Sequence, residues 1–585
     1  MTRPGGSRGG TSERRRRPTN ATLRFAQPDT RGDADGPVAR PLGRDPDPVA
    51  RELFKHATAA LVDEMAVAIV RTARSNNLKN SLDLSAALCD PQGRLLAQGL
   101  TLPLHLGSVP HAMRAFLDRF GDELRPGDVY ALNDPCNGST HLPDIYVAQP
   151  VFVDAQLCGH VVTIAHHTDV GGKTAGGNGC DATELVQEGL CLPPVRLMAG
   201  GTPVASVWRI IERNVRVPEQ VLGDLRAQVA AGHVGARGLR ELVQRHGVAG
   251  FAALSAATLD YAEAQARHAI RAIPDGVYAF TDYLDDDGID PGPLPIRVAI
   301  TVCGDELKAD FTGTAPQVRG GINCAEAFTE SAVYACVRCL MPTEMPNNEG
   351  YFRPIHVVAP EGSLVNPRPG AAVAARGLTG FRIANAVFGA LAQAVPGQVP
   401  AAEAGGDTGV SLAGFGPDGR AFVLLEFLFA SWGGRPFADG VDGAASLVVN
   451  FSNNPVEMIE AELPIAIDKY EFVPDTGGDG QYRGGLALER HYRILADQAT
   501  LQLRSDRRRR GPYGLGGGKP GGRSRNTLVR NGRRIRLPGK ATVTIVRGDV
   551  FEHQTAGAGG WGRPDQRDPA ARARDLREGK VTRGI

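Results

Sequence analysis

The sequence predicts an α/β chain (mixed α+β) of several closely packed domains, with extensive mixed β-sheet. Three observations lead to this fold class. The chain has 585 residues, which is too many for a single compact core. Its 73 glycines and 41 prolines cluster in short turns between apolar runs, a pattern typical of a strand-rich architecture. Apolar residues recur at helical spacing in two long stretches, 47–69 and 205–272.

Residues 1–45 are expected to form a disordered tail. The segment is rich in arginine, glycine and proline, includes the run Arg14–Arg17 and has almost no apolar residues. It cannot bury enough apolar surface to offset the entropy lost on ordering. Because no apolar stretch follows the arginines, we do not expect a secretory signal.

The first ordered element is predicted to be a helix that follows the capping residue Asp47, with Pro48 in its first turn. Its apolar face is formed by Phe54, Leu61, Met65 and Ile69. In the next segment, 82–88, leucine and alanine alternate with small or polar residues, which predicts a strand with one small, polar face. The turn at 90–93 then predicts a hairpin that returns through 95–97.

The rest of the chain is also predicted to alternate between strands and helices. Strands are predicted at 129–132, 145–153 and 161–165, helices at 331–340 and 381–394, and a glycine-rich, strand-like region at 470–562. We therefore expect an N-terminal metal-site domain at 46–275, a middle α/β domain at 276–400, a glycine-rich, β-rich C-terminal domain at 401–565 and a tail at 566–585.

Charge and cysteine usage exclude several classes of function. The formal net charge is +1, so no overall field attracts nucleic acid or a membrane surface. No run of about 18 apolar residues predicts a transmembrane helix. Nine cysteines, an odd number, in a chain without a signal peptide indicate the reducing cytoplasm. Cys336 and Cys339 form a lone C-x-x-C without a second pair, so we expect them on a buried helix rather than at zinc.

The segment 133–172 carries the strongest chemical signal. His141 and Asp144 are separated by a turn that contains Pro143, and His166 ends the apolar strand 161–165. Imidazole and carboxylate groups on a rigid turn and a strand end suit a divalent metal such as Zn²⁺, Mn²⁺ or Fe²⁺. The competing interpretation makes His141 and Asp144 turn caps and His166 a satisfied core histidine. Their clustering in one short segment favours the metal.

Three further residues belong to this hypothesis. Asp83, on the polar face of the early strand, would join the cluster only through tertiary folding. His167 should point to the face opposite His166 if the strand continues, so both are not expected to bind one ion. Asp169 would orient a ligating imidazole from outside the ligand set.

Other motifs are weaker. Residues 514–520 resemble a phosphate loop, but the spacing differs and Pro520 replaces the hydroxyl residue that would bind Mg²⁺. The acidic turn 285–288 lacks the downstream glutamate of a calcium loop and is expected to be solvated. The run Arg504–Arg510 is also expected to be a solvated face, with binding of an anion or an acidic partner as the alternative. No G-x-S-x-G motif supports a serine hydrolase.

Many ordered blocks between residues 47 and 564 resemble the hydantoinase B family, among them LDLSAALCDPQGRLLAQ, LPLHLGSVPHAM, AHHTDVGG, QEGLCLPPVRL and DTGGDGQYRGGL. This family comprises the B subunits of ATP-dependent N-methylhydantoinases and 5-oxoprolinases, and the matching subunits of acetone- and acetophenone-type carboxylases. The chain departs from the family pattern at Leu84, where phenylalanine is frequent, and at Ala558, which breaks a glycine run.

The resemblance implies a divalent metal held by Asp83, His141, Asp144 and His166. It also implies a hetero-oligomer with a hydantoinase A-type partner of actin-like ATPase fold, which would phosphorylate the amide or carbonyl oxygen of the substrate. ATP binding by another chain would agree with the absence of a phosphate-loop motif at residues 514–520.

The main functional hypothesis is the metal-bearing subunit of an ATP-dependent hydrolase that opens a cyclic amide, such as a hydantoin, 5-oxoproline or a lactam. His167 or Asp169 would act as a base or orienting group. One alternative is a subunit of an ATP-dependent ketone carboxylase, in which the metal would hold an activated enolate for attack on CO₂. Another is a non-catalytic scaffold for the ATPase partner.

Overall fold

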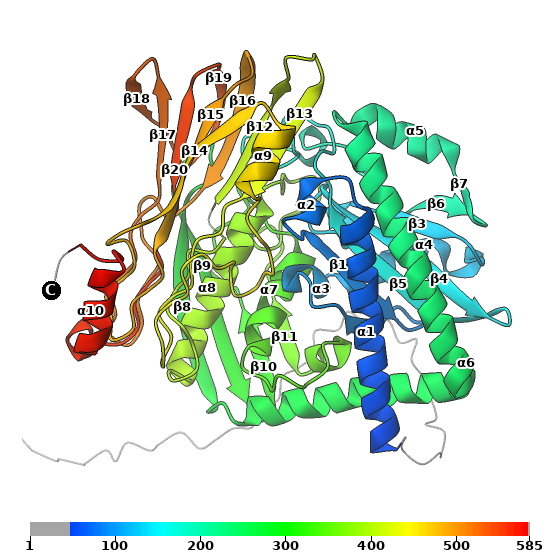
Figure 1. The fold of residues 1–585 in the computed structure, drawn as a ribbon. Helices are drawn as coiled ribbons and strands as arrows, with labels where there is room; N and C mark the ends of the chain where they lie inside the picture. Colours follow the sequence, from blue (N-terminus) through cyan, green and yellow to red (C-terminus); the bar gives the residue numbers. More distant parts are fainter. Residues whose placement is uncertain (1–46, 407, 583–585) are drawn as a thin grey trace, which may run out of the picture. The chain divides into compact units, whose positions relative to one another are not determined.

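The computed structural model describes residues 47–406 and 408–582, which belong to one compact unit, and confirms the predicted class of mixed helices and several sheets (Figure 1). The predicted tail at 1–45 lies outside the described residues, and the domain boundaries stay predictions. Among the helices in these two ranges, none is long and apolar enough to cross a membrane.

The N-terminal part forms a seven-stranded sheet in the order β2-β1-β5-β4-β3-β6-β7, and every neighbouring pair is antiparallel. The strands are β1 (Leu84–Cys89), β2 (Leu95–Gln98), β3 (Val129–Leu132), β4 (Asp144–Val153), β5 (Gln156–His166), β6 (Val195–Ala199) and β7 (Thr202–Pro203). The predicted hairpin of β1 and β2 is confirmed. Both faces of β1 are buried, the small, polar one included, because helices cover the sheet on each side.

Two long helices cover one face of this sheet (Figure 1). Helix α1 (Pro48–Thr72) begins as predicted, with the Asp47 carboxylate accepting the Val49 N–H. Helix α6 (Pro218–Arg271) turns sharply at Gly247, where φ is 69°. The apolar residues of both helices pack against β1 and β5. The shorter helices α2 (Asn76–Lys79) and α5 (Ala205–Asn214) flank them.

The opposite face of the sheet belongs to the largest apolar core, which it shares with the middle part of the chain. This part supplies helices α7 (Glu326–Arg338) and α8 (Arg376–Ala394) and the sheet β11-β10-β9-β8. Its strands are β8 (Gly276–Asp286), β9 (Pro291–Cys303), β10 (Glu306–Asp310) and β11 (Ile355–Val358). Helices α3 (Pro103–Leu106) and α4 (Val109–Phe120) lie on the same side. Residues 103–106 and 376 therefore come close to the ends of β4 and β5.

Two further sheets in the C-terminal part pack against each other. One has the order β13-β12-β16-β19 and the other β14-β15-β20-β17-β18. Their strands are β12 (Thr408–Phe415), β13 (Ala421–Phe427), β14 (Ile465–Val473), β15 (Ala487–Ile494), β16 (Gln498–Ser505), β17 (Arg525–Arg530), β18 (Arg533–Arg536), β19 (Lys540–Val546) and β20 (Val550–Gln554). Helix α9 (Val456–Glu462) precedes β14. The segment expected to be a tail contains helix α10 (Pro569–Arg577), fixed by the Arg567–Asp439 and Arg567–Asp575 ion pairs.

Two charged segments expected to face solvent are largely buried instead. In the arginine run, Arg507 binds Asp282 at 3.1 and 2.9 Å, and the neighbouring Asp506 binds Arg382 at 2.8 Å. In the acidic turn, Asp285 accepts backbone N–H groups of the arginine run. The two segments satisfy each other across the fold, which a charge pattern read along the chain does not reveal. Only the end of the run, Arg509–Arg510, is exposed.

Candidate metal site

Three candidate ligands come from the ends of three neighbouring strands. In the β4–β5 pair, Asp144 lies directly opposite His166. On the other side of β5, Leu84 pairs with Ala165, and the His166 N–H donates to the carbonyl oxygen of Asp83 at 3.1 Å. Cross-strand neighbours point to the same face of a sheet, so the three side chains gather on the face away from α1 and α6.

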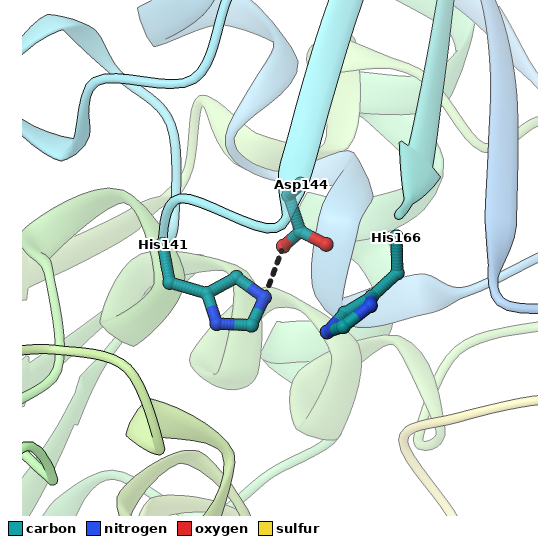
Figure 2. Close-up of side chains that lie close together, drawn as sticks. All are labelled: His141, Asp144 and His166. Atoms are coloured by element: carbon teal, nitrogen blue, oxygen red, sulfur yellow. Dashed lines mark ion pairs between the residues drawn. The ribbon is translucent and has the colours of Figure 1, made fainter. Parts of the chain in front are cut away.

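His141 joins them from the loop that leads into β4 (Figure 2). Its Nδ1 lies 2.8 Å from the carbonyl oxygen of Ala374, which requires an Nδ1–H donor. The lone pair is then on Nε2, which lies 3.3 Å from Asp144 Oδ2. The fixed carbonyl thus orients the imidazole toward the cluster, as an outer partner of a metal-binding histidine does.

The His166 ring lies beside that of His141, with 4.9 Å between ring centroids (Figure 2). Its Nδ1 lies 3.2 Å from the carbonyl oxygen of His167, and its Nε2 lies 3.3 Å from the side-chain nitrogen of Asn178. These partners fit a neutral ring with the proton on Nδ1 and the lone pair on Nε2.

Two overlapping groups of side chains have ligand atoms within 4.8 Å of one another: His141, Asp144 and His166, and Asp83, His105 and Asp144. Asp144 is common to both. His105, on the short helix α3, did not emerge from the sequence reasoning. Its Nε2 lies 3.4 Å from Asp144 Oδ2 and its Nδ1 lies 3.2 Å from Ser85 Oγ. It lies far along the chain from the H-x-x-D and H-H segments, and only the family block LPLHLGSVPHAM contains it.

Four ligand atoms of this cluster have no hydrogen-bond partner within the described part of the chain: Asp83 Oδ1, His105 Nε2, His141 Nε2 and Asp144 Oδ1. All five side chains of the two groups are at most 1% exposed. The two histidine nitrogens lie at ion-pair distance from Asp144 but lack hydrogen-bond geometry. Because unpartnered buried polar atoms are costly, their convergence on one place fits a cation. The nitrogen and carboxylate donors suit Zn²⁺, Mn²⁺ or Fe²⁺.

The two carboxylates of the cluster, Asp144 and Asp83, have pKa values shifted in opposite directions. Burial alone would raise the pKa of Asp144, but His141, His105 and Arg376 hold it well below its usual range. Burial and the nearby Asp144 charge raise the pKa of Asp83 well above its usual range. Burial and Arg376 lower the pKa of His141 to about 4, so this imidazole is neutral at physiological pH. A neutral imidazole and an ionised carboxylate are the states that bind metal.

Arg376, at the start of α8, is a second residue that the sequence reasoning missed. One guanidinium nitrogen binds Asp144 Oδ2 at 2.6 Å, and the Thr140 hydroxyl donates to the same oxygen. Its guanidinium also lies over the ring of Phe328. No motif marks this arginine, because only the fold brings α8 to the end of β4.

The structure places the two predicted catalytic residues away from the ligand atoms. His167 lies on the other face, as expected, and its Nε2 contacts the Gln228 side chain of α6 at 3.0 Å. Asp169 accepts the N–H groups of Gly171 and Gly176 and binds Arg216 through backbone and side chain. These contacts make Asp169 a residue that fixes the loop after β5. Among the described residues, the His166 ring donates no hydrogen bond to Asp169.

Comparison with known proteins places the chain in a family. The model of the hydantoinase B/oxoprolinase family matches residues 47–564, so the chain belongs to this family. The B subunit of a putative D-/L-hydantoinase from Pseudomonas sp. (strain NS671) is 32% identical over 556 residues, with 92% of this chain and 93% of that protein covered.

Two solved structures share the fold. The ATP-dependent caprolactamase from Pseudomonas jessenii has a TM-score of 0.86 at 29% identity, covering 92% of this chain and 94% of that one. A nucleotide-free acetone carboxylase structure also has a TM-score of 0.86, at 18% identity, covering 92% of this chain and 78% of that one. At this lower identity the likeness to acetone carboxylase concerns the fold alone.

Proposed function

We propose that this chain is the metal-bearing component of an ATP-dependent hydrolase that opens a cyclic amide such as a hydantoin, 5-oxoproline or a lactam. The observation that carries the proposal is the convergence of four unpartnered, buried ligand atoms beside His166. The names of the related hydantoinase and of the caprolactamase supply the substrate class.

His141, Asp144 and His166 would hold the metal, with Asp83, the residue directly before β1, next to them. When bound, a divalent metal would lower the pKa of a water molecule and so supply hydroxide near neutral pH. The chain's own residues prepare the site. Ala374 orients His141, Arg376 keeps Asp144 ionised, and burial of the cluster excludes bulk water.

ATP would be used by a separate subunit of the hydantoinase A type. The relatives bear names of subunits or of an ATP-dependent enzyme, and the glycine-rich segment 514–520 lacks a phosphate-loop sequence. The partner would phosphorylate the amide oxygen, and the activated ring would then be opened in this chain. Since His167 contacts α6 and Asp169 fixes a loop, we assign both a positioning role in this proposal rather than contact with substrate.

The experiment is co-expression with a hydantoinase A-type subunit, followed by assays of ATP turnover. Hydantoin, 5-oxoproline, caprolactam, and acetone with bicarbonate are compared as substrates. We expect ring opening coupled to ATP hydrolysis with at least one cyclic amide. Stimulation by acetone and bicarbonate alone would instead identify a ketone carboxylase.

Replacement of one ligand tests the metal. His141→Ala should lower both the bound metal in elemental analysis and the ring-opening rate, while His56→Ala, an exposed histidine on α1, should change neither. Ring opening by His141→Ala at the wild-type rate with no bound metal would refute a metal-dependent reaction.

A further inference from the structure

Arg504 is a buried arginine that the proposed metal site does not use. It lies on β16 directly opposite Gly409 of β12, and Gly409 in turn pairs with Phe427 of β13. A Cβ atom at position 409 would lie 2.4 Å from Arg504 Nε, so the glycine provides the space in which the guanidinium lies. The guanidinium carbon is 5.1 Å from the centroid of the Phe427 ring, a cation–π distance.

This row of residues leads to the candidate metal site. The Phe427 ring meets His166 edge to face, with 5.7 Å between centroids. Asn178 connects the same two places by hydrogen bonds. Its backbone carbonyl accepts from Arg504 Nη1 at 3.5 Å, and its side-chain nitrogen lies 3.3 Å from His166 Nε2. Arg504 is therefore one residue removed from a candidate metal ligand.

The positive charge of Arg504 has no carboxylate partner in an ion pair within residues 47–406 and 408–582, and its Nη2 has no hydrogen-bond partner there. Its neutral contacts are the Ser411 hydroxyl and the Asn178 carbonyl. Other buried arginines are paired: Arg507 binds Asp282, and Arg490 binds Glu426. Burial and the positive charge of Arg376 lower the pKa of Arg504 to about 10, at which it is still charged at neutral pH.

A buried charge without a counterion is costly, so a ligand that supplies the opposite charge would be stabilised here. We propose that Arg504, held by Phe427 and Ser411, forms an anion-binding subsite beside the metal site that takes the negatively charged oxygens of the substrate. The planar guanidinium fork matches the oxygens of a phosphoryl group or a carboxylate. This inference rests on the proposed function, in which the substrate arrives phosphorylated.

The first experiment measures the binding of inorganic phosphate to the full chain with its native metal, by isothermal titration calorimetry. Arg504→Met, which keeps volume but removes the charge, should weaken phosphate binding by about tenfold or more, as expected for a charge-assisted hydrogen bond. Arg509→Met is the matched control, because it removes an exposed arginine from the same run and should leave binding unchanged. Metal content must equal that of the wild type in both variants.

Arg504→Lys keeps the charge without the planar fork, and its phosphate affinity should fall by about threefold or more. If Arg504→Met does not fold, this variant decides the question. Wild-type phosphate affinity in either folded variant would overturn the proposal. The titration measures phosphate binding without turnover. Its result can therefore be interpreted even if no cyclic amide is opened in the ring-opening assay.

Kinetics in the complex with the A-type partner would show whether Arg504 binds the phosphoryl group or a carboxylate of the substrate. If Arg504 takes the phosphoryl group, Arg504→Met should lower kcat for cyclic amides with and without a carboxylate. If it takes a carboxylate of the substrate, KM should rise for 5-oxoproline and stay unchanged for caprolactam. Unchanged kcat and KM for both substrates would contradict an anion subsite of either kind.

Discussion

His105 occupies the side of Asp144 that faces the α3 helix. Its Nε2 is buried and directed at the shared carboxylate, while Ser85 holds the other ring nitrogen. Whether it binds the metal or orients Asp144, its removal should weaken metal binding. Loss of an orienting partner typically costs about 10- to 100-fold in metal affinity.

We therefore predict that His105→Ala lowers metal affinity by about 10- to 100-fold in competition with a chelator of known affinity. His268→Ala, an exposed histidine near the end of α6, should retain wild-type affinity. Equal metal affinity in His105→Ala and the wild type would show that His105 neither binds nor orients.

Titration of His160, on β5, should make the stability of the fold depend on pH in the acidic range. Burial lowers its pKa to about 4 from the ordinary value of 6.5, so the unfolded chain binds a proton that the folded chain does not. Stability is then lost as the pH falls from about 6.5 toward 4. This histidine should contribute about 2 kcal/mol of destabilisation between pH 7 and pH 5.

His160→Gln should remove that share of the difference between the free energies of unfolding at pH 7 and pH 5, measured in urea. The glutamine amide can still donate to the Pro91 carbonyl that His160 contacts. His268→Gln should leave the difference unchanged. A pH difference in His160→Gln as large as that of the wild type would contradict the assignment.

At the scale of elements, the periodicities predicted most helices and strands but not their neighbours. The spacing of Phe54, Leu61 and Met65 predicted α1, and the apolar run at 161–165 predicted β5. The sequence also singled out His141, Asp144 and His166, because a strand ends beside each short motif. Asp83 needed the family resemblance, since only strand order sets β1 beside β5. Strand order depends on tertiary packing that no local pattern encodes.

The bend of α6 is another feature that periodicity missed, and it depends on one backbone conformation. Gly247 has φ 69° and ψ 158°, a combination open essentially to glycine, and a Cβ there would meet nothing within 4 Å. Gly247→Ala should therefore destabilise the fold by about 1–3 kcal/mol through backbone strain alone, seen as a lower Tm.

Gly250→Ala is the matched control for this helix. Its Cβ would lie 3.6 Å from His246 Cβ, an ordinary contact, in a helical turn of the same helix. Alanine should raise stability there by up to about 1 kcal/mol. A Tm of Gly247→Ala at or above that of Gly250→Ala would show that the bend does not need a glycine.

At the scale of the whole molecule, the candidate site is assembled from distant parts of the chain. The seven-stranded sheet supplies Asp83, Asp144 and His166, the segment before α8 supplies Ala374 and Arg376, and β16 brings Arg504. The arginine run 504–510 shows why such a site is hard to predict from a charge pattern. Along the chain it is a charge cluster of the kind usually found on a solvated face, but the fold turns its first residues inward against acidic groups and the site.

A site enclosed in this way should exchange its metal slowly. The five side chains around it are at most 1% exposed, so a chelator reaches the ion only when the covering segments move apart. We predict that removal of the metal by excess chelator is slow in native buffer and becomes faster in urea concentrations too low to unfold the chain. The loss can be followed by elemental analysis of desalted samples. Removal that is complete on mixing and indifferent to urea would mean that the ion lies open to solvent, and would place it outside this cluster.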